Sequence, residues 1–532
     1  MKTFKILCIS LFLATVCLSC TEDLLNPLPK DRLAKELFWQ TEQDAVYAAN
    51  GIYSLLGGHW RYGMMDAYAD VAHVILQHRQ ESGIEKGVYN AANDVVANEW
   101  RYYYNIVFAS SSFLENIDGV TMDGVIKKRL IAEAKTLRAF AYINLVMLYG
   151  DVPLVTTSLT VSEAKAISQT PASAIWNFIS DELTAAAADL PPTYTTASDR
   201  GRITQGAALG LKARAMLYAG RWADAKAAAK AVMDLGVHGI YESYSKLFDY
   251  EGQGASEILF ARQYAKDVSA HSMFLFLTAN SIRTRSCEVI PTKPLVDAYL
   301  MKTTGLPVED PASGFDPFDP YKDRDPRLSY TIFVTGDELP NGQILNTLPN
   351  SPTADNYTSP SENATKTGWY FKKWVSNADY AVPNNCGVNL IYLRYAEVLL
   401  TYAEASVELG GAEIDQSVLN ALNAIRSRPD VDMPKITTLV QSELREIIRR
   451  ERKVELAMEG LRLYDIRRWH LLAEVMPGPL KGMTYEDPEN PGTLKTVSEE
   501  GYVKEFHERN YLWPLPFREL VMNPNLKQND GY

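Results

Sequence analysis

Two stretches of the chain, far apart in sequence, share one helix–turn–helix outline. Residues 207–234 form two alanine-rich segments of helical periodicity with Gly220 between them, and residues 390–427 repeat this outline, with Ala403 seven residues before Gly410. A single helix pair cannot bury its apolar face alone, so such units must stack on their neighbours. The sequence therefore predicts a mostly helical fold in which several helix pairs stack into one right-handed solenoid.

The first of these units has the spacing of the tetratricopeptide repeat. Ala213, Gly220, Trp222 and Ala225 stand at the mutual distances of that pattern, in which a small residue lets the paired helices approach and glycine turns the chain between them. Proteins built only of such repeats hold peptides in their concave face, so a protein-binding adaptor is one function to consider. Long insertions interrupt the repeats here, which favours a scaffold role.

Other parts of the chain divide into helical and loop-like segments. Apolar residues recur at helical spacing in four segments, Glu42–Tyr53, Trp100–Asp118, Lys127–Tyr149 and Ala172–Leu190. Residues 241–389 are instead rich in Gly, Pro, Asn and Asp, and we predict loops there with short strands at residues 257–261, 329–334 and 369–375. The proline-punctuated, aromatic stretch 511–532 is expected to pack back on the fold.

The densely charged stretch Gln441–His470 is predicted to be one helix with a single apolar stripe. Glu451, Glu455 and Glu459 follow one another at four-residue spacing on its other face. Three arginines, Arg449, Arg452 and Arg462, lie within reach along the same turns. A row of glutamates could serve acid–base chemistry, but ion-pair networks perturb carboxylates as well. We therefore interpret the row as an ion-pair lattice that docks neighbouring segments.

The charge balance and the cysteines exclude several classes of protein. The formal net charge of −12, with no polybasic run, argues against a nucleic-acid partner. Three of the five cysteines lie in the first twenty residues, which leaves only Cys287 and Cys386 beyond them. A disulfide framework is thereby excluded, and at most one bridge is available to the folded part.

The first twenty residues have the pattern of a bacterial lipoprotein signal. Lys2 and Lys5 precede an apolar run from Ile6 to Leu18 that is too short to span a membrane, and Cys20 follows a small residue. Cys17 departs from the leucine-like residue that this pattern prefers. We predict a signal peptide over residues 1–19 and a mature chain that begins at Cys20 and carries acyl chains there. The alternative is an ordinary signal peptide with an incidental cysteine.

Motifs of metal-dependent and nucleophilic enzymes are missing from the sequence. His73 and His78 are five residues apart and do not face each other on a helix, and the aspartates of residues 316–325 lack the spacing of a calcium-binding EF-hand loop. There is no glycine-rich phosphate loop, His-Glu-x-x-His or Gly-x-Ser-x-Gly motif. We predict no catalytic residue, metal or cofactor. A carboxylate-based glycosidase stays open as an alternative, because two acidic residues placed by the fold leave no short motif.

Several stretches together resemble the SusD/RagB family of surface nutrient-binding lipoproteins, and they span nearly the whole mature chain in the family's order. They are Phe38 and Trp39 with Asp44–Tyr53, Ala132–Phe140, Leu148–Pro153, Asp325–Arg327, Tyr392–Glu397, Arg449–Trp469, Tyr511–Pro514 and Asn529–Tyr532. The run with Arg-Arg-Glu-Arg, Glu-Gly-Leu-Arg and Asp-Ile-Arg-Arg-Trp is the most specific of them. Residues 110–112 depart from the family, which often has an Ala-Asn pair there.

The resemblance implies one all-α domain over residues 20–532. Its tetratricopeptide helices would lie within about residues 40–56, 100–235 and 390–470, and residues 241–389 would form a loop-rich, ligand-binding half. It also implies a lipid anchor at Cys20 on the outside of the outer membrane and a partnership with a SusC-like TonB-dependent transporter. The implied activity is binding without catalysis, usually of a glycan and sometimes of a peptide.

The ligand residues of this family lie in variable loops, so a physical argument must choose them. Sugars present apolar faces that stack on aromatic rings and hydroxyls that need amide or guanidinium partners. Residues with these properties in irregular segments are Trp60, Tyr62, Tyr89, Asn90, Arg283 and Tyr357. The other singled-out tryptophans, Trp39, Trp100, Trp222, Trp469 and Trp513, lie in periodic or motif contexts and are assigned to packing. We therefore predict glycan capture for import, with peptide binding in the same family as the alternative.

Overall fold

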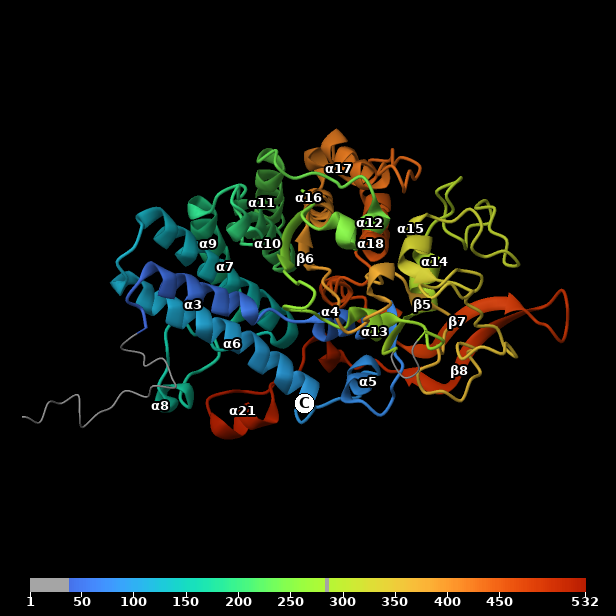
Figure 1. The fold of residues 1–532 in the computed structure, drawn as a ribbon, viewed down its shortest axis with the longest axis horizontal. Coiled ribbons are helices and arrows are strands. Elements are labelled where there is room, and N and C mark those ends of the chain that lie inside the picture. The colour runs from blue at the N-terminus through green and yellow to red at the C-terminus, as the bar shows by residue number, and fades with distance from the viewer. Residues whose placement is uncertain (1–37, 283–286) are drawn as a thin grey trace, which may run out of the picture.

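The computed structural model describes residues 38–282 and 287–532. Figure 1 shows the long helices gathered on one side and the loops, short helices and a long hairpin on the other. The long helices are α3 Glu42–Ser54, α6 Asp94–Asn116, α7 Gly124–Tyr149, α9 Ala172–Asp189, α10 Gln205–Tyr218, α11 Trp222–Asp234, α16 Tyr395–Leu409, α17 Gln416–Arg426 and α18 Gln441–Glu455.

Shorter helices occupy the connections and the loop-rich half. They are α4 His59–Ala67, α5 Gln80–Glu85, α8 Val161–Ala164, α12 Tyr244–Leu247, α13 Met273–Leu277, α14 Lys293–Ala298, α15 Arg327–Thr331, α19 Arg462–Arg468, α20 Leu472–Val475 and α21 Phe517–Met522.

The long helices pack in chain order, each on the next. α6 packs on α7, α7 on α9, α9 on α10 and α10 on α11, and α11 then packs on α16, which also contacts α17 and α18. The predicted stacking of helix pairs is confirmed. Small residues make the close approach possible, because Ala207, Ala213 and Ala225 are fully buried between the helices.

In the described residues there are four antiparallel strand pairs, three between segments that are distant in sequence and one within a hairpin. β1 Ala72–Val74 pairs with β3 Val289–Pro291, β2 Ile258–Arg262 with β6 Leu390–Arg394, β4 Ile332–Phe333 with β5 Tyr370–Phe371, and β7 Gly478–Glu486 with β8 Leu494–Lys504. The predicted strands near residues 257–261, 329–334 and 369–375 are present, although β4 and β5 are shorter than expected and α15 precedes β4.

Several segments differ from the expectation. Residues 390–394 form strand β6 rather than the first turn of a helix, because the run Leu-Ile-Tyr-Leu-Arg pairs with β2 and is buried. Residues 60–98, expected to be irregular, contain α4, β1, α5 and the start of α6. The hairpin of β7 and β8 was not foreseen.

The charged stretch Gln441–His470 is not one helix. α18 ends at Glu455, and α19 begins at Arg462. Between them Met458 and Gly460 have positive φ angles of 58° and 72°, a conformation that no helix interior contains. The single-helix prediction is therefore wrong, and the break turns the chain so that Glu459 lies beside the end of α18 rather than one turn further along it.

The C-terminal stretch packs back on the helices, as predicted. Trp513 is completely buried, and the side chain of Asn529 donates hydrogen bonds to the carbonyl oxygens of Tyr149 and Trp513 at 2.8 and 2.7 Å. Cys287 and Cys386 are both buried free thiols. Within residues 38–282 and 287–532 no helix combines the length and apolar character needed to cross a bilayer.

Candidate functional site

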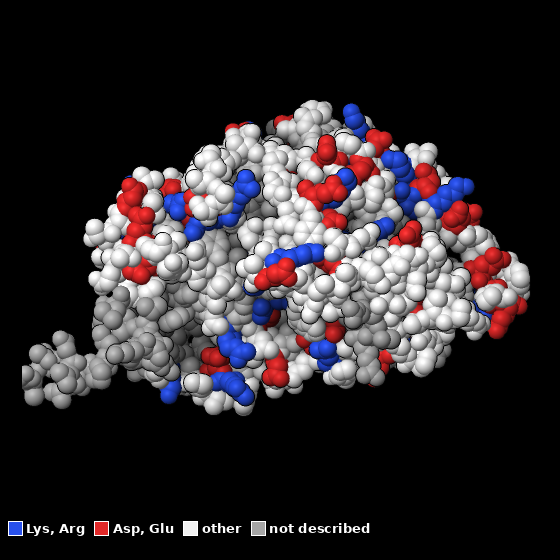
Figure 2. Space-filling model, viewed as in Figure 1, with Lys and Arg blue, Asp and Glu red and all other residues white. Residues whose placement is uncertain are grey.

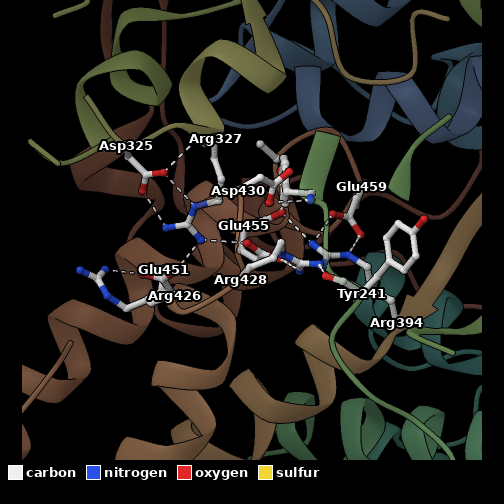
Figure 3. Close-up of polar contacts among 12 residues, drawn as sticks. Tyr241, Asp325, Arg327, Arg394, Arg426, Arg428, Asp430, Glu451, Glu455 and Glu459 are labelled. Carbon is white, nitrogen blue, oxygen red and sulfur yellow. Dashed lines mark hydrogen bonds and ion pairs between the residues drawn. The ribbon is translucent and has the colours of Figure 1, made fainter. Parts of the chain in front are cut away.

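The buried carboxylate of Glu455 is the centre of an ion-pair network that could be mistaken for a reactive site (Figure 3). Arg394 and Arg428 reach one of its oxygens at 2.7 and 3.0 Å, and Arg327 reaches the other at 2.8 Å. The side chains of these four residues are at most 1% exposed. The three arginines come from three different segments of the chain.

Further carboxylates complete the charge balance of these arginines. Glu257 accepts hydrogen bonds from Arg394 and Arg428, each at 2.8 Å. Glu459 accepts from Arg394 at 2.7 and 2.8 Å and from the buried ammonium of Lys373 at 2.8 Å. Burial lowers the pKa of Lys373 to about 8 even though the Glu459 carboxylate favours the charged form.

The other end of the network ties the loop-rich half to α18. Arg327 contacts Asp325 at 2.7 Å and Glu451 at 2.5 Å, and Arg426 contacts the second oxygen of Glu451 at 3.0 Å. The interpretation of the glutamate row as an ion-pair lattice is confirmed. The expected local partners were wrong, because the arginines that neutralise these glutamates lie in other segments.

The arginines beside these glutamates have partners of their own. Arg452 pairs with Asp465 at 2.8 Å, and Arg462 pairs with Asp70 at 2.7 Å. Burial alone would raise the pKa of Glu455, but the three arginine charges outweigh it and hold that pKa well below its usual range. A buried, permanently ionised and fully paired carboxylate has neither the proton nor the access that acid–base catalysis requires.

A different surface presents an aromatic ring to solvent. Trp60 lies in the first turn of α4 and is half-buried. Its ring meets the edge of Phe276 in α13 at 5.4 Å, and the guanidinium of Arg79 lies 4.7 Å from its centroid. The indole N–H donates to Glu81 at 3.3 Å. These contacts fix the orientation of the ring while part of it stays accessible.

Charged groups flank this tryptophan. Arg79 also contacts Glu288 at 3.0 Å, and both side chains are partly exposed. Burial raises the pKa of Glu288 to about 7. The positive charge of Arg79 opposes this rise, and the negative charge of Glu81 adds to it. Glu288 therefore changes its charge near neutral pH.

Neutral polar rings extend the surface on the other side of Trp60. His59 stacks on His271 with 5.8 Å between centroids, and His271 meets Tyr264 at 4.6 Å. Burial lowers the pKa of His59 to about 4, with a further contribution from His271 and Arg262, so His59 is neutral at pH 7. We name as the Trp60 surface the half-buried residues His59, Trp60, Arg79, Glu81, Tyr264 and Glu288.

The Trp60 surface lies where α4 packs on α13 and where Trp60 bonds to Glu81 of α5, near the middle of the view in Figure 1. Figure 2 shows that the area over α13 and β5 carries few charged side chains on this face. Such a mostly uncharged area beside a few charged groups is a common setting for ligands that combine apolar and polar parts.

Only part of the predicted binding set lies on the Trp60 surface. Tyr62 is 4% exposed and donates its hydroxyl hydrogen to the carbonyl oxygen of Ile391 at 2.7 Å, and Tyr89 is 6% exposed and packs on Trp513. The expectation that these two tyrosines are exposed on a loop was wrong. Helix α4 and the C-terminal stretch turn them toward the core.

The other predicted residues lie elsewhere or outside the described parts. Asn90 is exposed, and its side-chain oxygen accepts a hydrogen bond from the amide of Ala92. Tyr357 shares a hydrogen bond of 2.9 Å with Tyr485 on the hairpin strand β7. Arg283 and Cys20 fall outside the residues that the structure describes.

Sequence reasoning missed most members of the Trp60 surface. His59 and Arg79 lie between or beside the predicted residues Trp60 and Tyr89 in the sequence, but no spacing relates them to Tyr264 or Glu288, which lie about two hundred residues further along. The pairing of β1 with β3 brings Glu288 beside α5. Within residues 38–282 and 287–532, no group of three or more His, Cys, Asp or Glu side chains has the arrangement of a metal site.

The sequence matches two protein-family models and several known proteins. A family model described as "SusD family" matches residues 256–532, and one described as "Starch-binding associating with outer membrane" matches residues 48–217. SusD-like protein P25 of Formosa agariphila is 26% identical over 98% of this chain and 97% of its own.

Solved structures share the fold. A SusD-like carbohydrate-binding protein of Bacteroides fragilis is 30% identical and superposes with a TM-score of 0.82, covering 92% of this chain and 100% of its own. A structure described as a laminarin-binding SusD-like protein is 22% identical with a TM-score of 0.70, covering 93% of this chain and 100% of its own. The predicted fold class, mostly helical with a loop-rich half that contains short strands, is confirmed.

Removing the charge of Glu455 should strongly destabilise the protein. In Glu455→Gln, Arg394, Arg428 and Arg327 stay buried with one countercharge fewer, and we expect a loss of about 3–5 kcal/mol in the free energy of unfolding. Urea unfolding at pH 7 measures it. Glu446→Gln is the control, because Glu446 is exposed and pairs only with Arg449, so its loss should be much smaller. Equal losses for both variants would contradict the role assigned to Glu455.

Glu288 should make stability depend on pH near neutrality. Its pKa is about 7 in the folded protein and near 4.3 in an unfolded chain, so the folded state binds the proton more tightly. Stability should fall as the pH rises from about 5 to about 8. Glu288→Gln removes this component, so its free energy of unfolding relative to the wild type should increase over that range, whereas exposed Glu251→Gln should follow the wild type. Parallel curves for all three proteins would refute the raised pKa.

Proposed function

This chain belongs to the SusD family, and from that premise we propose that it is a cell-surface protein that captures oligosaccharide or polysaccharide for import. The observation that carries the proposal is the half-exposed ring of Trp60, held between Phe276 and the guanidinium of Arg79. SusD-family proteins bind nutrients and are not enzymes.

The chemistry of the Trp60 surface suits a saccharide. A pyranose ring has an apolar C–H face that stacks on an indole, and its hydroxyls need donors and acceptors at the rim. Trp60 offers the face, while Arg79 and Glu288 offer a donor and an acceptor beside it. Because existing contacts already hold the indole, little side-chain entropy is lost when a ligand binds.

The relatives support a saccharide over a peptide as the ligand class. One of the two solved structures described above is named as carbohydrate-binding and the other as laminarin-binding. The carboxylates of the Trp60 surface do not form a free catalytic pair, because Glu288 is paired with Arg79 and Glu81 accepts from Trp60. These pairings favour binding over hydrolysis.

In this proposal the protein is anchored in the outer membrane and faces the cell surface. Acyl chains on Cys20 hold it there, and it delivers its glycan to a SusC-like TonB-dependent transporter. Support comes from the N-terminal lipoprotein pattern and from the family model described as associating with the outer membrane, which matches residues 48–217.

Trp60→Ala should weaken glycan binding. Calorimetric titration of the purified protein with a panel of neutral oligosaccharides identifies a ligand, and loss of the stacking face should then lower the affinity about tenfold, the equivalent of roughly 1.4 kcal/mol. Trp222→Ala is the matched control, because Trp222 is also half-buried but begins α11 in the helical half. Its affinity should equal that of the wild type.

Other outcomes would assign another function. A protein that ignores every glycan but binds a pool of peptides belongs to the peptide-binding branch of the family, and one that captures a partner protein without any small ligand is an adaptor. Reproducible cleavage of a labelled polysaccharide would make it a glycosidase. Each of these results overturns glycan capture as proposed.

A further inference from the structure

A groove of about 860 Å³ lies away from the Trp60 surface, with which it shares no residue. It opens where the ends of α7 and α19 meet the start of α9 and the C-terminal stretch. The lining residues that matter below are Asp151, Trp176, Tyr218, Arg467, Tyr511 and Lys527.

Arg467 is a buried cation in the wall of this groove. Its side chain belongs to a residue that is only 4% exposed, and the guanidinium makes two long hydrogen bonds, to the carbonyl oxygens of Met147 at 3.3 Å and Asn510 at 3.2 Å. Among the described residues Arg467 forms no ion pair, and its Nε has no hydrogen-bond partner. Its guanidinium lies 5.8 Å from the centroid of the buried Trp513 ring, which is a weaker partner than a carboxylate. A guanidinium has five N–H groups, so most of the donor capacity of Arg467 is unused.

Other buried arginines in the described parts of the chain are better satisfied. Arg394, for example, contacts three carboxylates. Arg324 resembles Arg467 in lacking an ion pair, but it donates four hydrogen bonds to the carbonyl oxygens of Val296, Tyr299 and Pro320 at 2.7 to 3.3 Å. A buried charge without a countercharge is costly, so the environment of Arg467 favours an added anion.

The rest of the lining reinforces this preference. Lys527 is exposed at the rim, and Asp151 is the one acidic residue among the lining residues. Arg468 also lines the groove, but it is paired with Glu404 and Asp465. An oxygen of the Asp151 carboxylate already accepts a hydrogen bond from the amide of Ala172 at 2.8 Å. The groove therefore has an excess of positive charge although the whole protein is acidic.

Aromatic side chains stand beside these cations. Trp176 and Tyr511 are half-buried lining residues, and the buried hydroxyl of Tyr218 has no hydrogen-bond partner among the described residues. The ring of Tyr511 also contacts the rings of His470 and Phe506, with 5.0 and 5.5 Å between centroids. A partly exposed ring such as Trp176 next to unused donors suits a ligand that is itself a ring with an apolar face and an acidic substituent.

The wall amides argue against a peptide as the ligand. Asn525 donates to the carbonyl oxygen of Ala166 at 2.6 Å, and Gln169 accepts from the amide of Lys527 at 2.8 Å. The side-chain amide of Gln528 accepts a hydrogen bond from the backbone N–H of Leu515 and donates one to its carbonyl oxygen. These groups hold the C-terminal stretch in place and are not free to pair with a peptide backbone.

We infer that this groove is a second ligand site that takes an acidic saccharide, with the carboxylate of a hexuronate unit against Arg467 and Lys527 and its ring against Trp176 or Tyr511. The inference goes beyond the proposed function because it adds a separate site and a charged ligand class. A fixed arginine with spare N–H groups is well suited to a carboxylate, which accepts two parallel hydrogen bonds.

The test is calorimetric titration of the purified protein with a hexuronate trimer and with a neutral hexose trimer of equal length. We expect the acid to bind, and Trp176→Ala and Lys527→Gln each to weaken it about three- to tenfold. Raising sodium chloride from about 0.05 to about 0.5 M should also weaken it. Arg467→Gln should abolish binding. If this buried substitution impairs folding, Trp176→Ala and Lys527→Gln still test the site, because both residues are at least partly exposed. Trp222→Ala should leave the affinity unchanged.

Several outcomes would overturn the second site. The first is the absence of hexuronate binding. The second is that the acid and the neutral trimer bind with the same affinity, and that Trp176→Ala and Lys527→Gln do not change this affinity. The third is displacement of the acid by a glutamate tripeptide at the same concentration. Dependence of hexuronate binding on Trp60 but not on Trp176 would place the acid on the Trp60 surface. That result would reject the groove while glycan capture stood, whereas a failure of neutral glycans alone would reject only the Trp60 surface as a site for neutral sugars.

Discussion

The contact between Glu455 and three buried arginines is the interaction on which the rest of the structure depends. Arg327 comes from the loop-rich half, Arg394 from strand β6 and Arg428 from the turn after α17. In water each of these groups is well solvated, and in the protein none is, so a partial assembly would leave buried charge without a partner. The network therefore favours one complete arrangement of the segments over any incomplete one.

This arrangement also determines where the Trp60 surface lies. Arg394 fixes β6 at the network, and the hydroxyl of Tyr62 bonds to the backbone of β6 from helix α4. The carboxylate of Asp66, also in α4, accepts hydrogen bonds from the backbone N–H groups of Gly460 and Arg462 at the break between α18 and α19. Helix α4 is thus held from both sides, and Trp60 at its start projects from a rigid base.

The helix pairs were predictable from the sequence, whereas the long-range contacts and some local features, such as the break between α18 and α19, were not. The helix pairs follow from periodicity and from small residues at fixed spacing, which a single sequence displays. Residues 390–394 form a strand because they pair with β2, which is distant in sequence. The five residues themselves contain no signal that predicts this partner. Trp60 and Tyr62 are aromatic residues two positions apart, and the sequence does not distinguish their roles. They differ because the side chain of Tyr62 is buried and that of Trp60 is only half-buried. Glu288 joins Arg79 by strand pairing, which no motif records.

Native-state hydrogen exchange in increasing denaturant tests most directly whether the Glu455 network and the Trp60 surface form one cooperative unit. The buried amides of α4, β6 and α18 should then open together, with one free energy and one dependence on denaturant. The contradicting result is protection in α4 that disappears at much lower denaturant than protection in β6 and α18. That would mean that the base of the Trp60 surface is held independently of the buried charges.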